Sequence, residues 1–541
     1  MMLVPKLFTT IKEYDSKTFF SDLSSGFILG IIAIPLSIAF AISSGVSPEK
    51  GIIAAIIGGF IVALLGGSRV QIAGPTGAFV ALIYGIVVKF GVSGLILSTI
   101  MAGIFLIIMG VLKLGTIIKF IPHSITSGFT SGIAVLIFTN QINDITGLKA
   151  DNSLNFFEKW LYYLKNISNV SYITFLLFIF CIFCLFVWPK INKKFPSSII
   201  IILLSILLNN LFNLEIATIG SAFGDLSLKF NLMDFSSIQF SDIQLLLIPA
   251  ISIAILGGIE SLLSAVVADG MIGGNHRSNM ELVAQGTANI LCAMFGGIPV
   301  TGAIARTAAN VKNGGRTPVS GIIHSLTILI IMIFLTPYLK HIPLVTLSSI
   351  LIFVSINMFE IETFKNIKNN HAYDNIVFLL TFILTFTFDL IIAIQVGIIF
   401  SAFLFMKRMM EVSKISYFKE EIEDKELNDK LHFSSSNNLK GKVEIYEING
   451  PFFFAAAENL LKINSELNYN PELLVLKMTQ VPFIDSTALN TLNRFAISMK
   501  KRNTKVFIAE ADVEVKKIIL KNEIENIFFI DKMKDIIVNK D

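Results

Sequence analysis

Two short interruptions of otherwise apolar sequence carry residue types that could bind a ligand. The first is Gly74-Pro75-Thr76-Gly77-Ala78 and the second is Pro299-Val300-Thr301-Gly302-Ala303, with the threonines 225 positions apart (301 − 76). Each predicts a short extended piece followed by the first turn of a helix, where unpaired N–H groups and about half a positive charge attract anions. Two such N-termini facing each other would bind an anion without Lys or Arg. The candidate binding residues are Thr76, Gly77, Ala78, Thr301, Gly302 and Ala303.

The composition places both interruptions inside a membrane protein. Of the 541 residues, 54% are hydrophobic and 15% are charged, and the mean hydropathy is +0.73, whereas soluble domains carry about 25% charged residues. Broken backbone at membrane depth is tolerated only where it is buried in protein or lines a cavity. Matching breaks in two halves of a chain therefore indicate the binding site of a transporter.

The composition also argues against other classes of protein. The net charge of +4 is modest and no basic-aromatic run occurs, so we expect no nucleic-acid partner. We expect Cys181, Cys184 and Cys292 to be packed free thiols because all three lie in apolar segments. No apolar span carries a nucleophile and base at a workable spacing, so we expect neither an enzyme nor a cofactor.

Apolar runs predict fourteen membrane spans. They are Leu23–Ser43, Gly51–Leu65, Ile72–Val88, Leu95–Leu112, Ile121–Ile142, Tyr172–Trp188, Ser197–Leu211, Leu245–Ala268, Met280–Phe295, Thr301–Val311, Val319–Leu335, Leu344–Phe359, Ile376–Phe388 and Leu390–Met406. The tenth is too short to cross as a full helix, and Asp389 divides the last apolar block. Seven spans in each half, about 23–212 and 243–410, force the second repeat to be inverted, so that the third and tenth spans enter from opposite sides.

Loop charges predict the orientation of the chain. Lys and Arg concentrate in the loops on the same side as the N-terminal segment 1–22, which predicts a cytoplasmic N-terminus in a multi-pass protein of the plasma (inner) membrane. The transmembrane domain then covers 23–410, followed by a charged linker over 411–440. Residues 441–541 predict a cytoplasmic α/β domain. Its expected strands are Val443–Ile448, Leu473–Met478 and Val506–Ala509, and its helices are Ala455–Leu467, Thr487–Met499 and Val513–Leu520.

Several motifs resemble the SulP family of anion transporters (sulfate permeases). They are Gly257–Gly270, Asn279–Gly286, Phe295–Pro299 with Arg306-Thr307, Ser68–Phe79 and Thr387–Leu390, and Val443–Val538 resembles the family's C-terminal STAS domain. The resemblance implies an α-helical protein of seven-plus-seven inverted repeats, with discontinuous third and tenth spans, a core bundle moving against a gate bundle, and a homodimer. It implies transport of inorganic anions or small carboxylates. A sodium-coupled branch of the family suggests a cation near Glu260 and Ser264, with Thr76 and Thr301–Ala303 across the site.

Glu260 lies in the middle of a predicted span. Placing a charge inside the membrane costs free energy, so an ionisable residue there indicates a functional role. The Glu260 carboxylate would repel a bound anion unless the carboxylate holds a proton or a sodium ion lies between the carboxylate and the anion. Either arrangement would couple the transport of the anion to that of a cation. The alternative is a structural ion pair with Arg306. We expect Asp269 to cap or pair locally, Asp389 to lie in a turn, and His123, His324 and His341 to be packing or interfacial residues.

The C-terminal domain carries Asp485-Ser486 at a strand-to-helix junction that resembles the phosphorylatable loop of anti-sigma-factor antagonists. A helix N-cap is the favoured role, with phosphorylation of Ser486 as the alternative. The domain is expected to stabilise the dimer or to bind a cytoplasmic protein partner. The favoured function is symport of a small anion of the sulfate, bicarbonate or dicarboxylate class with H+ or Na+ across the plasma membrane, by alternating access. The alternatives are an uncoupled anion channel or exchanger, a nucleobase permease, and a membrane-anchored signalling protein.

Overall fold

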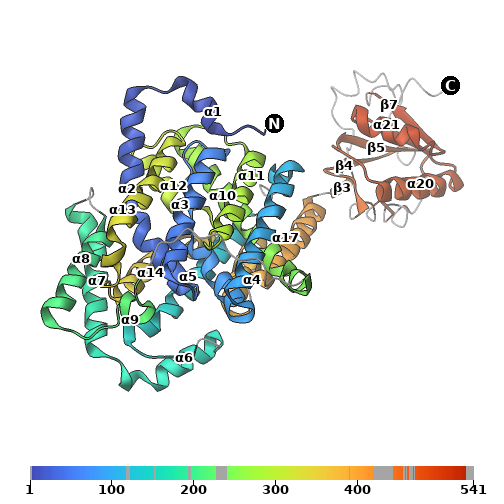
Figure 1. The fold of residues 1–541 in the computed structure, drawn as a ribbon. Coiled ribbons are helices and arrows are strands. Elements are labelled where there is room, and N and C mark those ends of the chain that lie inside the picture. Colours follow the sequence, from blue (N-terminus) through green and yellow to red (C-terminus); the bar gives the residue numbers. More distant parts are fainter. Residues whose placement is uncertain are drawn as a thin grey trace. The chain divides into compact units, whose positions relative to one another are not determined.

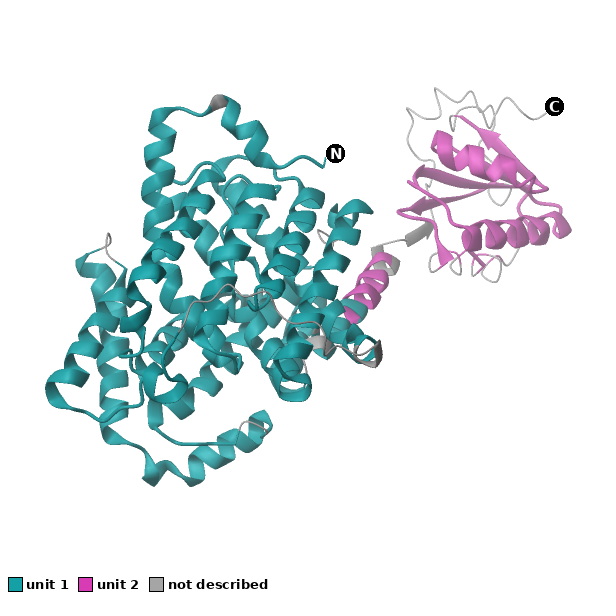
Figure 2. Cartoon of the chain, in the orientation of Figure 1, with its two compact units in different colours: residues 1–399 teal, residues 400–541 magenta. Residues whose placement is uncertain are grey.

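The computed structural model divides into two compact units, residues 1–399 and 400–541 (Figure 2). The residues described are 3–116, 122–151, 154–192, 196–226, 240–388, 390–412, 414–417, 443–454 and 470–531, with a few positions between 455 and 469. Asp389, most of the predicted linker and most of the predicted helix Ala455–Leu467 lie outside them.

The first unit is helical, and every predicted span corresponds to a helical segment (Figure 1). The first half contains α1 (Lys6–Thr10), η1 (Ile11–Glu13), α2 (Ser16–Ser43), α3 (Pro48–Leu65), β1 (Ala73–Gly74), α4 (Gly77–Val111), α5 (His123–Thr146), α6 (Phe156–Lys165), η3 (Ile167–Asn169), α7 (Tyr172–Ile191), α8 (Ser197–Phe212) and α9 (Ile219–Phe223). The second contains α10 (Phe240–Ile272), α11 (Ser278–Met294), β2 (Thr301–Gly302), α12 (Ile304–Lys312), α13 (Val319–Leu339), α14 (Leu344–Met358), α15 (Ile361–Lys365), η4 (Asn366–Lys368), α16 (Ala372–Thr387) and the start of α17 (Leu390–Val412), whose residues from 400 on belong to the second unit.

The helix lengths and hydropathy confirm a helical membrane fold. Among the described residues, eight helices are long and apolar enough to cross a membrane, and α8 and α16 are shorter apolar helices. Helix α4 covers the predicted fourth span and most of the third, and it is broken between them at Gly91, whose φ of 69° is not helical. In both halves, the third span begins with a short strand and continues as a helix.

The helices of the first unit form two packed groups. Helices α2, α3, α4, α10, α11, α12 and α13 pack together, and helices α5, α7, α14 and α16 form the second group. The repeats approach closely inside the first group: a Cβ on Gly103 of α4 would lie 2.6 Å from the Gly286 carbonyl of α11. Small residues of this kind drive helix association in membranes, where burying apolar surface gives no advantage over lipid.

The strands β1 and β2 join the two halves at the breaks. They pair antiparallel, with Ala73 opposite Gly302 and Gly74 opposite Thr301. The N-caps of the following helices are Thr76 for α4 and Ala303 for α12, which are 227 positions apart (303 − 76). The sequence offset of 225 therefore does not align equivalent backbone positions, because Thr76 is a helix N-cap whereas Thr301 lies in β2, before the N-cap of α12.

The second unit contains a five-stranded sheet in the order β3-β4-β5-β6-β7. Its strands are β3 (Lys414–Tyr417), β4 (Val443–Asn449), β5 (Leu473–Gln480), β6 (Lys505–Ala509) and β7 (Ile527–Ile530), with helices α20 (Ser486–Lys501) and α21 (Val513–Lys521). The β3–β4 pair is antiparallel and the other pairs are parallel. The linker predicted from 411 is thus corrected: α17 continues to Val412, and the short alternating stretch Lys414–Tyr417 forms an edge strand.

Candidate functional site

The strand pair brings two helix N-termini together in the first unit. The Ala303 N–H donates to the Ile72 carbonyl at 2.9 Å, which extends the pairing beyond β1. The Thr76 hydroxyl is directed to α10, and Ala303 has no polar side chain, so neither of these N-cap residues caps its helix with a side chain. The first N–H groups of α4 and α12 therefore remain available to an anion.

One face of α10 supports the strand pair. The Thr301 hydroxyl donates to the Gly257 carbonyl at 2.8 Å, and the Thr76 hydroxyl donates to the Glu260 carboxylate at 2.9 Å. One turn further along, the Ser264 hydroxyl donates to the Thr307 hydroxyl at 3.0 Å. The spacing of Gly257, Glu260 and Ser264 places these groups on one side of a helix. Helix α10 thus contacts both breaks.

Glu260 directly contacts Thr76, the N-cap of α4. Its partner Thr76 is buried and precedes the first turn of α4. Among the described residues, Glu260 forms no ion pair with Arg306, although the two charges are close enough to interact electrostatically. Of the residues predicted to surround a cation, Thr76 contacts Glu260, whereas Ser264 and Thr301 donate to other groups.

Arg306 lies in the first turn of α12 and is directed back to the first break. Its Nη2 donates to the Pro75 carbonyl, and its Nη1 has no hydrogen-bond partner among the described residues. A Cβ on Gly74 would lie 2.7 Å from Nη1. The guanidinium is buried, with 6% of the residue exposed. A buried cation with a free donor beside two helix N-termini strengthens the attraction for an anion.

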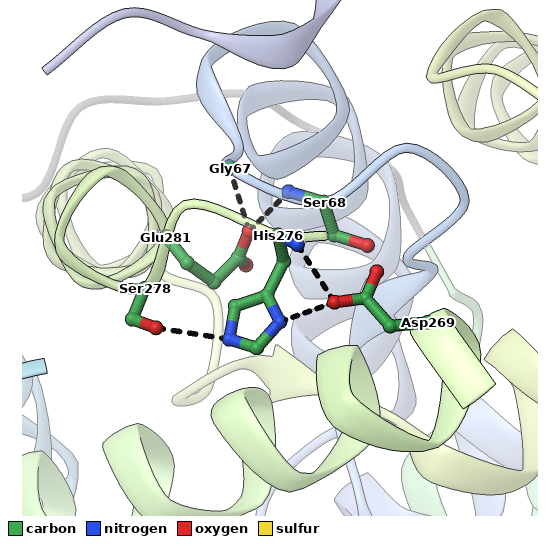
Figure 3. A network of polar contacts seen from close by, with 6 residues as sticks. All are labelled: Gly67, Ser68, Asp269, His276, Ser278 and Glu281. Atoms are coloured by element: carbon green, nitrogen blue, oxygen red, sulfur yellow. Dashed lines mark hydrogen bonds and ion pairs between the residues drawn. The ribbon is translucent and has the colours of Figure 1, made fainter. Parts of the chain in front are cut away.

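Glu281 is a buried acid in α11 to which sequence reasoning gave no role. Its carboxylate accepts hydrogen bonds from the Gly67 N–H at 2.8 Å and the Ser68 N–H at 3.1 Å, both in the connection to β1 (Figure 3). It also accepts from the Ser261 hydroxyl and the Gln285 amide. In the sequence, an acidic residue inside an apolar span was the feature that could have indicated a role for Glu281. Glu281 fixes the path of the backbone that enters the first break.

Two buried asparagines position the breaks in the same manner. Asn289 of α11 makes both backbone hydrogen bonds of Val300: its amide donates to the carbonyl and its oxygen accepts from the N–H, each at 2.9 Å. Asn310 of α12 donates to the Val70 carbonyl at 2.8 Å. Both residues satisfy backbone groups that would otherwise be unpaired in the membrane. Their amides within apolar helices were the signal in the sequence.

Of the remaining predicted residues, Cys292 and His324 lie near the breaks. The Cys292 thiol donates to the Ile298 carbonyl at 3.1 Å, and a Cβ placed on Gly59 would lie within 4 Å of both the Ala73 carbonyl and the His324 ring. Asp269 pairs locally as expected, with the His276 Nδ1 and N–H both at 2.7 Å (Figure 3). His324 is buried in α13, and Cys181, Cys184 and Cys292 are free thiols. Among the described residues, no group of three His, Cys, Asp or Glu could hold a metal ion.

A pocket lies at the junction of α5 with the α14–α15 connection, separate from the breaks. It has a volume of about 600 Å³, and its lining includes His123, Glu360 and Glu362. The Ser127 hydroxyl contacts His123 Nδ1 at 3.0 Å and donates to Glu360 at 2.6 Å. These bonds join α5 to the connection between α14 and α15. The chemistry expected of the breaks does not involve this pocket.

In the second unit, Asp485 is a helix N-cap. Its carboxylate accepts from the Ala488 N–H at 2.7 Å and from the Phe454 N–H at 3.0 Å. It therefore holds the start of α20 against the segment that follows β4. Ser486 is the exposed first residue of α20.

Replacing Asp485 with alanine should destabilise the start of α20. Loss of an N-cap acceptor costs about 1–2 kcal/mol, so we expect faster hydrogen exchange of the first-turn amides of α20 in the full-length protein. The Ser486→Ala variant is the matched control, because its exposed side chain is not the cap. Equal protection of α20 in wild type and Asp485→Ala would contradict this role.

The fold and site together define a class of protein. Two repeats whose broken helices meet at polar, uncapped N-termini inside a membrane domain form the architecture of secondary transporters. The sequence matches the model of the sulfate permease family over residues 19–381 and that of the STAS domain over residues 437–536. The chain belongs to the sulfate permease family. It is a multi-pass membrane transporter with a C-terminal STAS domain, and not an enzyme.

Named relatives and solved structures agree with this assignment. The YvdB protein of Bacillus subtilis (strain 168), named provisionally as a sulfate transporter, is 36% identical over 94% of this chain and 95% of its own length. The bicarbonate transporter BicA of Picosynechococcus sp. is 26% identical over 91% and 88% of the two chains.

Two solved structures share the fold. The murine Solute Carrier 26 family member A9 anion transporter in the inward-facing state has a TM-score of 0.85 at 17% identity, covering 97% of this chain and 92% of its own. The transmembrane domain of a cyanobacterial BicA has a TM-score of 0.64 at 26% identity, covering 72% of this chain and 98% of its own.

Proposed function

We propose that this protein carries a small oxyanion, sulfate or bicarbonate, across the plasma membrane by symport with a proton or a sodium ion. The main support is the contact between Thr76, the N-cap of α4, and Glu260 of α10. It places a carboxylate directly beside a helix N-terminus that can bind an anion. The names of the similar transporters support the class of substrate.

The coupling follows from electrostatics in a medium of low dielectric constant. An anion at the N-termini of α4 and α12 is attracted by their N–H groups and by Arg306, but is repelled by an ionised Glu260. A proton on Glu260, or a sodium ion between Glu260 and Thr76, removes the repulsion. Anion and cation therefore each improve the binding of the other. The binding residues in this proposal are Thr76, Gly77, Ala78, Thr301, Gly302 and Ala303.

The proposal includes a topology and an assembly. Lys and Arg in the loops favour an N-terminus and a STAS domain on the cytoplasmic side. We propose a homodimer, and a cytoplasmic protein partner for the STAS domain. Phosphorylation of Ser486 would regulate the binding of that partner to the STAS domain. Ser486 is suited to carry a phosphate, because it is exposed at the start of α20, where added negative charge is stabilised.

The test is radiolabelled uptake by the purified full-length protein in proteoliposomes. Sulfate and bicarbonate are each offered with an inward proton gradient, an inward sodium gradient, or neither. We expect one gradient to drive accumulation of one anion above its equilibrium level. Equilibration without accumulation under all three conditions would instead identify a channel or an exchanger. Uptake of nucleobases, offered in the same assay, in place of either anion would identify a nucleobase permease.

A further inference from the structure

The N-terminal segment is held against one end of the first helix group by two loops. The Lys6 N–H donates to the Gly66 carbonyl at 2.9 Å, at the end of α3. The Arg277 Nη1, at the start of α11, donates to the Val4 carbonyl at 2.8 Å and the Pro5 carbonyl at 3.3 Å. The Arg277 N–H also donates to the Gly67 carbonyl at 2.9 Å. Three segments distant in sequence are thus joined by backbone hydrogen bonds.

This junction gathers positive charge. Burial, followed by the charges of Arg277 and Arg69, lowers the pKa of the Lys6 ammonium. Arg69 is exposed and lies in the connection from α3 to β1. Among the described residues, no carboxylate forms an ion pair with Lys6, Arg69 or Arg277. The Asp269 carboxylate opposes part of this effect at Lys6, and the positive charge that three cations leave at one place favours an anionic ligand.

The nearby acids are already engaged by other partners. Asp269 accepts from the His276 ring and N–H, and the fully buried Glu281 accepts from two backbone N–H groups (Figure 3). Glu281 also accepts from two side chains. The Ser68 hydroxyl, next to Arg69, is buried without a hydrogen-bond partner among the described residues. A buried unsatisfied hydroxyl is costly, and an added ligand oxygen would satisfy it.

The same segment exposes large apolar side chains. Leu3, Phe8 and Ile11 are 47%, 56% and 55% exposed, whereas Leu7 between them is buried. Exposed apolar residues beside basic ones are typical of a segment that lies in a membrane interface and contacts anionic headgroups. A free inorganic anion would account for the charges but not for the apolar residues.

We propose that Lys6, Arg69 and Arg277 bind the phosphate of an anionic phospholipid, whose acyl chains lie against Leu3, Phe8 and Ile11. The site is separate from the anion site at the strand pair. Arg69 is four residues before β1 (73 − 69), so a lipid bound here would fix the backbone that leads into the first break. The bound lipid therefore stabilises the transport domain on the side that we propose to be cytoplasmic.

The test measures lipid binding by the full-length protein in neutral detergent, without transport. Dioctanoyl phosphatidylglycerol, dioctanoyl phosphatidylcholine and inorganic phosphate are titrated separately, with dissociation constants from native mass spectrometry and thermal unfolding midpoints in parallel. We expect saturable binding and stabilisation with phosphatidylglycerol, and much weaker effects with the other two. Binding of phosphatidylcholine or inorganic phosphate as tight as that of phosphatidylglycerol would overturn the proposal.

Variants localise the site. The Lys6→Gln/Arg69→Gln double variant should bind phosphatidylglycerol about 25-fold more weakly, because each basic residue near an anionic lipid contributes about fivefold. Lys12→Gln/Lys17→Gln removes the same charge from exposed positions nearby and should leave binding within about twofold. Lys6→Arg/Arg69→Lys keeps the charge and should restore binding, which separates a lost ligand contact from misfolding. An equal loss in the Lys12/Lys17 variant, or no loss in the Lys6/Arg69 variant, would contradict the site.

Discussion

Replacing Glu260 with glutamine is expected to remove the dependence of anion uptake on a proton or sodium gradient. Glutamine can still accept the hydrogen bond from Thr76 that Glu260 accepts at 2.9 Å, but it carries no charge and binds no proton in this range of pH. A coupling free energy of about 1–3 kcal/mol corresponds to about 5- to 150-fold in affinity. The gradient-driven stimulation should fall by that factor.

The measurement compares gradient-driven uptake with counterflow exchange in the same proteoliposomes. We expect Glu260→Gln to retain exchange while losing accumulation, because the anion still meets the N-termini of α4 and α12. The matched control is Glu362→Gln, which makes the same change at an exposed residue outside the strand pair. Unchanged accumulation in Glu260→Gln would exclude Glu260 as the coupling residue and leave it a structural role.

Replacing Gly74 with alanine is expected to reduce anion transport by about tenfold or more and to lower stability. The new Cβ would lie 2.7 Å from Arg306 Nη1, in a backbone conformation with φ of +156° that favours glycine. Either the guanidinium leaves the Pro75 carbonyl or the strand pair opens, and strain of this kind costs about 1–3 kcal/mol. Since a 1.4 kcal/mol change in binding is tenfold, a loss of this size is expected for the anion.

Gly85→Ala provides the control for the previous variant. Gly85 lies in α4, only eleven positions beyond Gly74 (85 − 74), and a Cβ there would meet nothing within 4 Å. Alanine is favoured over glycine in a helix by about 1 kcal/mol, so this variant should keep transport and unfold at the same or a higher temperature. Wild-type uptake by Gly74→Ala would show that the Arg306 contact is not needed for transport.

The helices and the two breaks could be predicted from the sequence because both depend on local composition. Apolar runs determine the spans, and Thr-Gly-Ala after proline marks the helix starts. The exact register could not be predicted, because it depends on strand pairing between residues over 200 positions apart: Thr301 lies opposite Gly74, and its hydroxyl is buried against Gly257. Sequence identity between the repeats suggested Thr76 and Thr301 as equivalents, whereas Thr76 is a helix N-cap and Thr301 lies in β2.

The supporting residues were also beyond local reasoning. Glu281 was visible as an acid in an apolar span, but its partners Gly67 and Ser68 are more than 200 positions away. An ion pair of Arg306 with Glu260 was the alternative interpretation of the sequence, and Arg306 donates to the Pro75 carbonyl. In each case the residue type indicated a buried polar contact, and only the packing of the two repeats determined the contact that formed.

The pairing of β1 with β2 limits how the transporter can release its cargo. Pulling the two strands apart would expose backbone N–H and C=O groups where no water is available, at several kcal/mol for each group. We therefore expect the N-terminal ends of α4 and α12 to move together during transport, because the β1–β2 hydrogen bonds join the two repeats. The access of the anion to either side would then depend on the neighbouring helices, and the proposed anion site would keep its shape.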